Sequence, residues 1–176
     1  MKFFETRLKG AFIVEIEPRI DNRGFFVRTF CQREFEAYKM NSNIAQCNLS
    51  YNHLKGTLRG MHYQLSPKAE TKFIYCTQGA IYDAIIDLNP QSPTYCQWFG
   101  IELSAENRKM LYVPEGFAHG YQALLDGATV FYQVSEFYSP EHERGVRWND
   151  PVFGIEWPIS NPILSEKDST FEDYKP

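Results

Sequence analysis

An arginine and a histidine stand three positions apart in residues 55–64, which read KGTLRGMHYQ. A neutral imidazole accepts a proton near pH 7, and a guanidinium stays charged and binds anions. Side chains alternate along a strand, so His62 and Arg59 would lie on opposite faces unless Gly60 interrupts the pleat. The pair indicates either an acid–base site that binds an anion or a half-buried strand with one hydrogen-bonded histidine.

A second histidine, His119, lies in residues 114–120, which read PEGFAHG. Together with GTLRGMH, this segment resembles the two motifs of the cupin superfamily, a small antiparallel barrel of two sheets. Metal-binding cupins carry HxH and a nearby Glu in the first motif. Here Gln64 replaces the second histidine and Glu70 is out of place, so the residues make a poor transition-metal site. The sequence favours a cupin without a metal.

The length of 176 residues predicts one domain, residues 1–176. A hydrophobic content of 43% excludes a disordered chain, and a net charge of −4 argues against a nucleic-acid partner. No run approaches the roughly 20 apolar residues of a membrane span, and the N-terminus does not resemble a signal peptide. We therefore expect a cytoplasmic protein. Four widely spaced cysteines without a CxxC pair are expected to be small core residues.

Short apolar and aromatic segments separated by turn residues predict an all-β fold with a few short helices. A helix is expected at 32–39, and the tail from about 157 is expected to wrap the surface as coil. Strands are expected at 10–16, 25–30, 44–51, 55–64, 72–76, 80–88, 97–103, 110–113, 120–124 and 129–137.

Two alternating patterns bear on binding. Gln46, Asn48 and Ser50 would share one strand face, where an inward row of amides indicates a polar ligand and an outward row only a solvated face. Arg28 would share a face with Phe26 and another aromatic side chain, either as a residue at a sheet edge or as part of a binding floor.

Six segments extend the resemblance over nearly the whole chain: LRGMHYQ, VPEGFAHG, RWNDP, NPILSEKD, DNRGFF and LSAENR. In their order along the chain they are similar to the dTDP-4-dehydrorhamnose 3,5-epimerases. The resemblance implies a cupin-type jelly-roll β-sandwich or barrel, a homodimer, no cofactor and no metal. It implies epimerisation of a nucleotide-linked 4-keto-6-deoxy sugar, in the synthesis of deoxy sugars for surface glycans such as the O-antigen.

A 4-keto sugar has acidified C–H bonds at C3 and C5. A base removes one proton, an enolate forms, and an acid returns a proton to the opposite face. Carried over by position, the resemblance assigns His62 as the base and Tyr132 as the acid. Lys72 would stabilise the enolate oxygen O4, and Asp168 would orient and polarise His62.

The resemblance also implies a binding set. Tyr138 and Phe26 would sandwich the nucleobase, and Arg23 and Arg59 would contact the diphosphate and nucleotide. We expect Arg23 and Phe26 to come from the partner subunit of a dimer. The further binding positions implied are Gln46, Asn48, His119, Glu143 and Lys167.

Position 28 departs from the family pattern, which has a Glu that can accept the N3–H of thymine. Arg28 has only donors, which suit N3 and O2 of cytosine and suggest a CDP-linked substrate. Cys47, where the family commonly has Asp, also removes a carboxylate. The alternative is that Arg28 turns outward or pairs with Glu34 or Glu36, and that thymine binds through Gln46.

Other outcomes remain open at this point. Relatives with the same base, acid and lysine act at C3 and C5, at C3 alone or at C5 alone. The chain could also bind a nucleotide sugar without turnover or isomerise a keto sugar, although a binder needs neither His62 nor Tyr132. A metal-dependent oxygenase is a more distant alternative.

Overall fold

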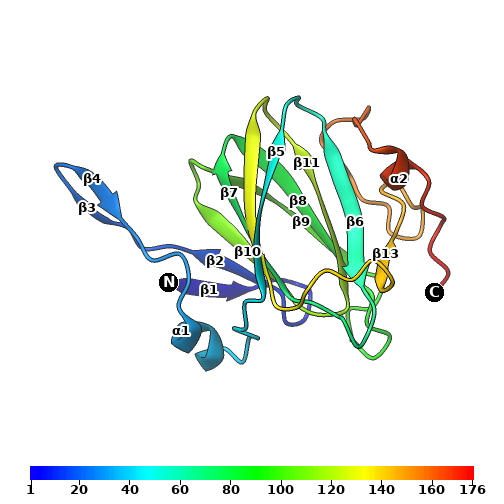
Figure 1. Ribbon diagram of the computed structural model, residues 1–176, viewed down its shortest axis with the longest axis horizontal. Helices are drawn as coiled ribbons and strands as arrows, with labels where there is room; N and C mark the ends of the chain where they lie inside the picture. Colours follow the sequence, from blue (N-terminus) through cyan, green and yellow to red (C-terminus); the bar gives the residue numbers. More distant parts are fainter.

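Two antiparallel sheets form a sandwich in the computed structural model, which describes residues 1–176 (Figure 1). The six-stranded sheet has the order β1 (Lys2–Glu5), β2 (Phe12–Glu15), β10 (Lys109–Val113), β7 (Lys72–Gln78), β12 (Ala128–Val134) and β5 (Gln46–Asn52). The five-stranded sheet has the order β13 (Glu143–Gly145), β6 (Leu58–Gln64), β11 (Phe117–Ala123), β8 (Ala80–Asp87) and β9 (Trp98–Ser104). The predicted all-β jelly-roll class is confirmed.

The space between the sheets is apolar in one part and polar in another. Buried side chains of β7 to β12, including Ile74, Ile85 and Leu111, form the main hydrophobic cluster. Burying such side chains is the principal stabilising contribution in a fold of this kind. The inward side chains of β5 and β6 are instead mostly polar, which leaves an interior suited to a polar ligand.

A second apolar layer covers the outer face of the five-stranded sheet. Met61 of β6 and Ile86 of β8 pack there against Val146, Phe153 and Ile155 of the C-terminal segment. This segment contains the short helix α2 (Glu166–Ser169), and Ile163 forms a parallel bridge with Thr57. The tail from about 157 is therefore not coil throughout, because it is fixed by packing and hydrogen bonds along β6.

A β-bulge in β6 determines where its side chains lie. His62 pairs with His119 and Arg59 pairs with Tyr121, so three steps on β6 match two on β11. The extra residue lies at Gly60, which has φ +124°, and a Cβ there would lie 2.5 Å from Gly120 Cα. Because the bulge shifts the alternation, Arg59 and His62 face the same side of the sheet.

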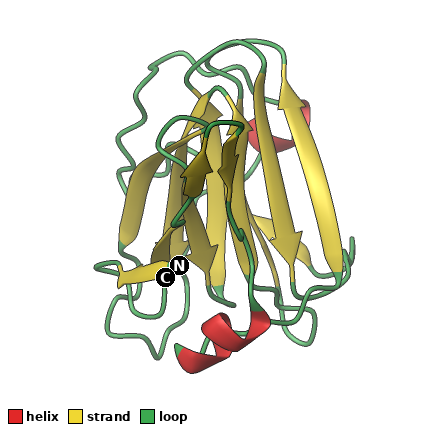
Figure 2. Cartoon of the chain, turned by 90° about the vertical axis from the view of Figure 1, so that its left-hand side faces the viewer, coloured by secondary structure: helices red, strands yellow, loops and turns green.

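A hairpin of β3 (Arg19–Asp21) and β4 (Gly24–Phe26) projects from the sandwich as an arm (Figure 1) and points toward the viewer in Figure 2. Its side chains Ile20 and Phe26 are 77% and 71% exposed. The strand predicted at 25–30 therefore ends at Phe26, because the residues that follow have no strand to pair with in the chain. The Arg108 guanidinium lies 4.3 Å from the ring centre of Phe25 and links the arm to the body.

The remaining expectations concern the helix and the cysteines. The predicted helix is present as α1 (Gln32–Ala37), whose Phe35 is buried against Phe73 at a centroid distance of 4.9 Å. Cys76 is buried, and burial raises the pKa of its thiol to about 11. Cys47 is exposed on the outer face of β5, so the expectation that all four cysteines are core residues is wrong. No helix has the length and apolar character needed to cross a membrane.

Candidate active site

Two adjoining cavities open between the sheets and share His62, Lys72 and Tyr132. The first, of about 260 Å³, is lined by Ser50, Arg59, His62, Lys72, His119, Tyr121, Tyr132, Ser165, Lys167 and Asp168. The second, of about 360 Å³, is lined by Gln46, Asn48, His62, Tyr63, Gln64, Glu70, Lys72, Tyr132, Val134, Tyr138 and Glu143. The structure thus brings together eleven of the fourteen residues singled out from the sequence, and the row of Gln46, Asn48 and Ser50 faces inward.

His62 and Asp168 form a hydrogen-bonded pair, with 2.6 Å between Nε2 and Oδ1. Asp168 is only 4% exposed, and its other carboxylate oxygen accepts the Gly60 N–H at 3.3 Å. Burial raises the pKa of Asp168, but the bonds from His62 and Gly60 outweigh this effect and hold the pKa below its usual value. Asp168 is therefore ionised at neutral pH and can only accept, so Nε2 carries the proton and Nδ1 of the neutral ring is free to act as a base.

The helix α2 presents Asp168 to this histidine. Ser165 caps the helix, and its Oγ accepts the Asp168 N–H at 3.1 Å. The N-cap bond satisfies one of the free N–H groups that begin a helix, which explains why a four-residue helix forms here. The cap, the Gly60 bulge and His62 therefore fix the carboxylate from three sides.

Tyr132 lies across the interior from His62. It belongs to β12 of the six-stranded sheet, whereas His62 belongs to β6 of the five-stranded sheet. Burial raises the pKa of Tyr132, and the neighbouring Tyr121 and Glu70 raise it further. The phenol therefore stays protonated at neutral pH and can donate a proton from the side opposite the base.

Lys72 supplies a cation between these two groups. Its Nζ lies 3.1 Å from Glu70 Oε1 and 3.5 Å from the carbonyl oxygen of His62. The side chains of Lys72 and Glu70 are each 11% exposed, so the ammonium is sheltered from water while its charge is compensated. An oxyanion that formed beside His62 and Tyr132 would meet this ammonium.

A second histidine–carboxylate pair lies on the neighbouring strands. His119 Nε2 is 2.8 Å from Asp83 Oδ1, and His119 is the cross-strand partner of His62. Asp83 is fully buried, and its Oδ2 has no hydrogen-bond partner. Each histidine of the cavities thus bonds a carboxylate, and no group of three or more His, Cys, Asp or Glu side chains is placed to hold a metal ion.

Glu143 of the second cavity bonds one side chain of each cavity, Tyr138 and Lys167. Glu143 Oε2 accepts the Tyr138 hydroxyl at 2.7 Å and lies 2.6 Å from Lys167 Nζ. The Tyr138 backbone N–H donates to Gln46 Oε1 at 2.8 Å. Arg59, held by its Nε bond to Asn52 at 2.9 Å, adds a cation to the first cavity besides Lys72 and Lys167. Lys167 and Arg59 can therefore meet an anionic group that enters here.

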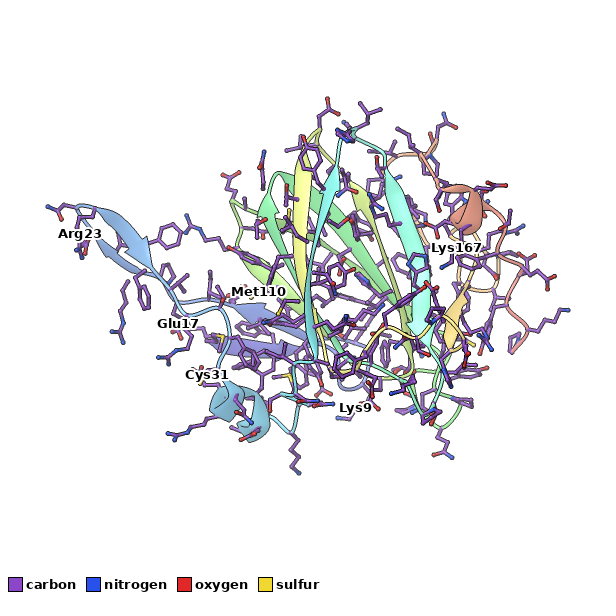
Figure 3. All side chains as sticks on the ribbon, viewed as in Figure 1. Lys9, Glu17, Arg23, Cys31, Met110 and Lys167 are labelled. Atoms are coloured by element: carbon purple, nitrogen blue, oxygen red, sulfur yellow. The ribbon has the colours of Figure 1, made fainter.

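Three predicted binding residues do not reach the cavities of their own chain. Arg23 and Phe26 belong to the arm, and Figure 3 shows Arg23 at the end of the molecule opposite Lys167. Arg23 forms an ion pair with Asp21 at 2.7 Å. Arg28 Nη1 lies 3.7 Å from Glu34, which is the pairing that the sequence left open.

Several residues of the site, three that line the cavities and one that bonds His119, carry no signal that the sequence motifs could use. Asp83, Glu70, Tyr121 and Ser165 stand outside the histidine motifs. The charge of Asp83 within the apolar run AIYDAIID of β8 is the one local sign that a buried partner exists.

Comparison with known proteins bears on the same fold and site. The family model described as dTDP-4-dehydrorhamnose 3,5-epimerase matches residues 5–175. The chain is 43% identical over 169 residues to the dTDP-4-dehydrorhamnose 3,5-epimerase of Shigella flexneri, which covers 96% of this chain and 93% of the relative.

Two solved structures extend the comparison. The dTDP-4-dehydrorhamnose 3,5-epimerase of Bacillus anthracis with TDP and PPi bound has a TM-score of 0.95, 44% identity and coverage of 98% of this chain and 99% of the other. ChmJ, a 3'-monoepimerase from Streptomyces bikiniensis in complex with dTDP-quinovose, has a TM-score of 0.88, 32% identity and coverage of 96% and 85%. The chain belongs to the dTDP-4-dehydrorhamnose 3,5-epimerase family.

Proposed function

We propose that the chain epimerises a dTDP-linked 4-keto-6-deoxy sugar at C3 and C5, with His62 as base and Tyr132 as acid. The observation that carries this assignment is the placement of the two groups on opposite sheets around shared cavities. A sugar ring held between the sheets would present one face to each group. Inversion at a carbon needs proton removal from one face and proton delivery to the other.

Inversion at one carbon takes two proton transfers, one from the carbon to His62 and one from Tyr132 to the carbon. His62 Nδ1 takes the proton from the carbon beside the C4 ketone, and the electron pair of the broken C–H bond forms the C=C of the enolate. The negative charge moves to O4, where the Lys72 ammonium stabilises it. Tyr132 then donates its hydroxyl proton to the opposite face of the same carbon, and the C=O is restored. Water then takes the proton from His62 Nδ1 and returns one to the Tyr132 oxygen, which resets both groups. Asp168 accepts the hydrogen bond from Nε2–H throughout and stabilises the imidazolium that forms.

The nucleotide part of the substrate is assigned to the second cavity. Gln46 and Asn48 of β5 offer amides, and Tyr138 offers a half-exposed ring against which a base can stack. Lys167 and Arg59 lie on the side of the first cavity and suit the diphosphate. The related structures with TDP or dTDP-quinovose bound support a thymidine nucleotide for this chain.

We also propose a homodimer in which each arm completes the partner's site. The arm exposes Ile20 and Phe26, and β5 exposes Leu49 and Tyr51 at 68% and 50% on the outer face of the six-stranded sheet. Apolar side chains in such numbers indicate a surface that another copy covers. Docking of the arm beside β5 would bring Arg23 and Phe26 toward the second cavity.

The compartment follows from the substrate class. Nucleotide sugars are made in the cytoplasm, and all four cysteines of the chain are free thiols. Unpaired thiols are the norm in a reducing compartment, which supports a cytoplasmic enzyme.

Replacement of the base tests the reaction. In D2O, NMR of the 4-keto-6-deoxy substrate with the wild-type protein is expected to show deuterium at both C3 and C5. His62→Ala is expected to slow this exchange by roughly 10²- to 10⁴-fold, the range for loss of a general base, while dTDP affinity stays within about twofold. A wild-type protein that binds dTDP but exchanges neither carbon would instead support a binding protein. Exchange at one carbon only would limit the reaction to a single centre.

Mixed dimers test whether the arm of one subunit completes the site of its partner. His62→Ala lacks the base but keeps the arm, whereas the double variant Arg23→Ala/Phe26→Ala keeps the base but lacks the arm contacts. Each variant alone is expected to be inactive. Co-expression is expected to restore roughly a quarter of the wild-type rate, because half of the dimers are hybrids with one complete site of two. Hybrids that form without any recovery would contradict an arm supplied by the partner.

Nucleotide titration tests which nucleobase the chain recognises. The Arg28–Glu34 pair supports thymine recognition without Arg28, whereas the missing acceptor at this position supports a CDP-linked substrate. We expect dTDP to bind at least about tenfold more tightly than CDP, a difference of ~1.4 kcal/mol, and Arg28→Ala to leave that ratio unchanged. If CDP binds more tightly than dTDP and this preference is lost in Arg28→Ala, the chain recognises cytosine and not thymine.

A further inference from the structure

The ring of Phe171 lies against the imidazole of His62. The ring centroids are 5.9 Å apart with an interplanar angle of 74°, which is an edge-to-face arrangement. Phe171 follows Asp168 by three residues and lies just beyond the end of α2. One turn of chain therefore offers His62 both a carboxylate at Nε2 and an aromatic ring beside it. Phe171 lines neither cavity, so it has no direct place in ligand binding.

Gly145 makes this contact possible. It is the cross-strand partner of His62 in the β13–β6 ladder, where opposite side chains lie on the same face. A Cβ built at Gly145 would overlap the ring of Phe171. The φ of Gly145 lies outside the left-handed region, so the backbone accepts any residue. Glycine is needed at this position because it has no side chain, and the ring of Phe171 occupies the space beside His62 that a side chain would fill.

We propose that Phe171 is a positioning residue that keeps His62 Nε2 bonded to Asp168 and Nδ1 turned toward the cavities. A single hydrogen bond fixes one edge of an imidazole but leaves it able to rock about Cβ–Cγ. The His62 side chain is 30% exposed, so water can also compete for its polar edge. A ring packed beside the imidazole restricts this motion and excludes water. The effect on rate rests on the proposed function, whereas the effect on ring orientation does not.

Two variants approach the contact from its two sides. Phe171→Ala removes the ring, and Gly145→Ala displaces it. Each is expected to lower kcat for C–H exchange by roughly tenfold, because misplacing a reacting group by a fraction of an ångström is costly. Neither variant touches the cavities, so the Kd for dTDP is expected to stay within about twofold. Phe171→Leu, which refills part of the space, is expected to recover part of kcat.

The double variant Gly145→Ala/Phe171→Ala identifies the mechanism. If the alanine methyl acts by pushing the ring away, the double variant is no worse than Phe171→Ala alone, since no ring is left to displace. Tyr174→Leu is the matched control. It removes an aromatic side chain from the same tail, but that ring packs on Phe153 at 5.4 Å and is not in contact with His62. Its kcat is expected to equal that of the wild type.

NMR of protein with ¹⁵N-labelled histidine gives a readout that does not depend on activity. The His62 Nε2–H signal, protected by Asp168, is expected to broaden or exchange faster with water in Phe171→Ala and Gly145→Ala, and to be unchanged in Tyr174→Leu. Wild-type His62 signals and wild-type kcat in Phe171→Ala would overturn the proposal, as would equal losses in Tyr174→Leu. A wild type that exchanges no C–H bond counts against the proposed function, and the imidazole signal then still decides the role of Phe171.

Discussion

The hydrogen bond from His62 Nε2 to Asp168 is the interaction on which the rest of the site depends. It joins β6 to the C-terminal helix α2, and it decides which ring nitrogen is free to take a proton. The bulge at Gly60 contributes twice, since its N–H bonds the same carboxylate and its extra residue turns Arg59 inward. The tail is held in place by bonds that run in both directions between Gln122 and Ile159. The tautomer of His62 therefore depends on the C-terminal tail as much as on β6.

The second constraint is the distance that the sandwich sets between its two sheets. Because its apolar part fixes the spacing of the two sheets, the inward side chains of its polar part face each other across a set distance. His62 and Tyr132 stand on opposite sheets, and burial keeps the phenol protonated. The ammonium of Lys72, compensated by Glu70, lies between them. The sandwich that stabilises the fold therefore also places His62 and Tyr132 where they can reach opposite faces of a ring bound between the sheets.

Sequence patterns predicted the parts of the molecule that depend on local order. Alternation placed the amides of β5 on one face. The spacing of Arg59 and His62 named a break at Gly60 as one of two possibilities, and pairing with β11 was needed to decide between them. The partner of a buried charge could not be predicted, since His119 and Asp83 meet only when β11 and β8 pair.

Short elements with few apolar residues were also missed. The three-residue strand β13 pairs with β6 but has no periodicity of its own. The turn at residues 21–24 could be predicted from the sequence, but not that its hairpin projects from the sandwich (Figure 1). Motif resemblance named roles for residues, and the fold was needed to show which of them share a cavity.

Replacing the phenol of Tyr132 separates proton removal from proton delivery, so Tyr132→Phe shows whether base and acid act from opposite faces. With the 4-keto-6-deoxy substrate in D2O, this variant keeps His62 and so is expected to exchange substrate C–H bonds. Without the donor on β12, inversion of configuration is expected to fall by at least roughly 10²-fold relative to that exchange. NMR distinguishes deuterium incorporation with retained configuration from epimerised product. Inversion at the wild-type rate in Tyr132→Phe would contradict the two-sheet mechanism.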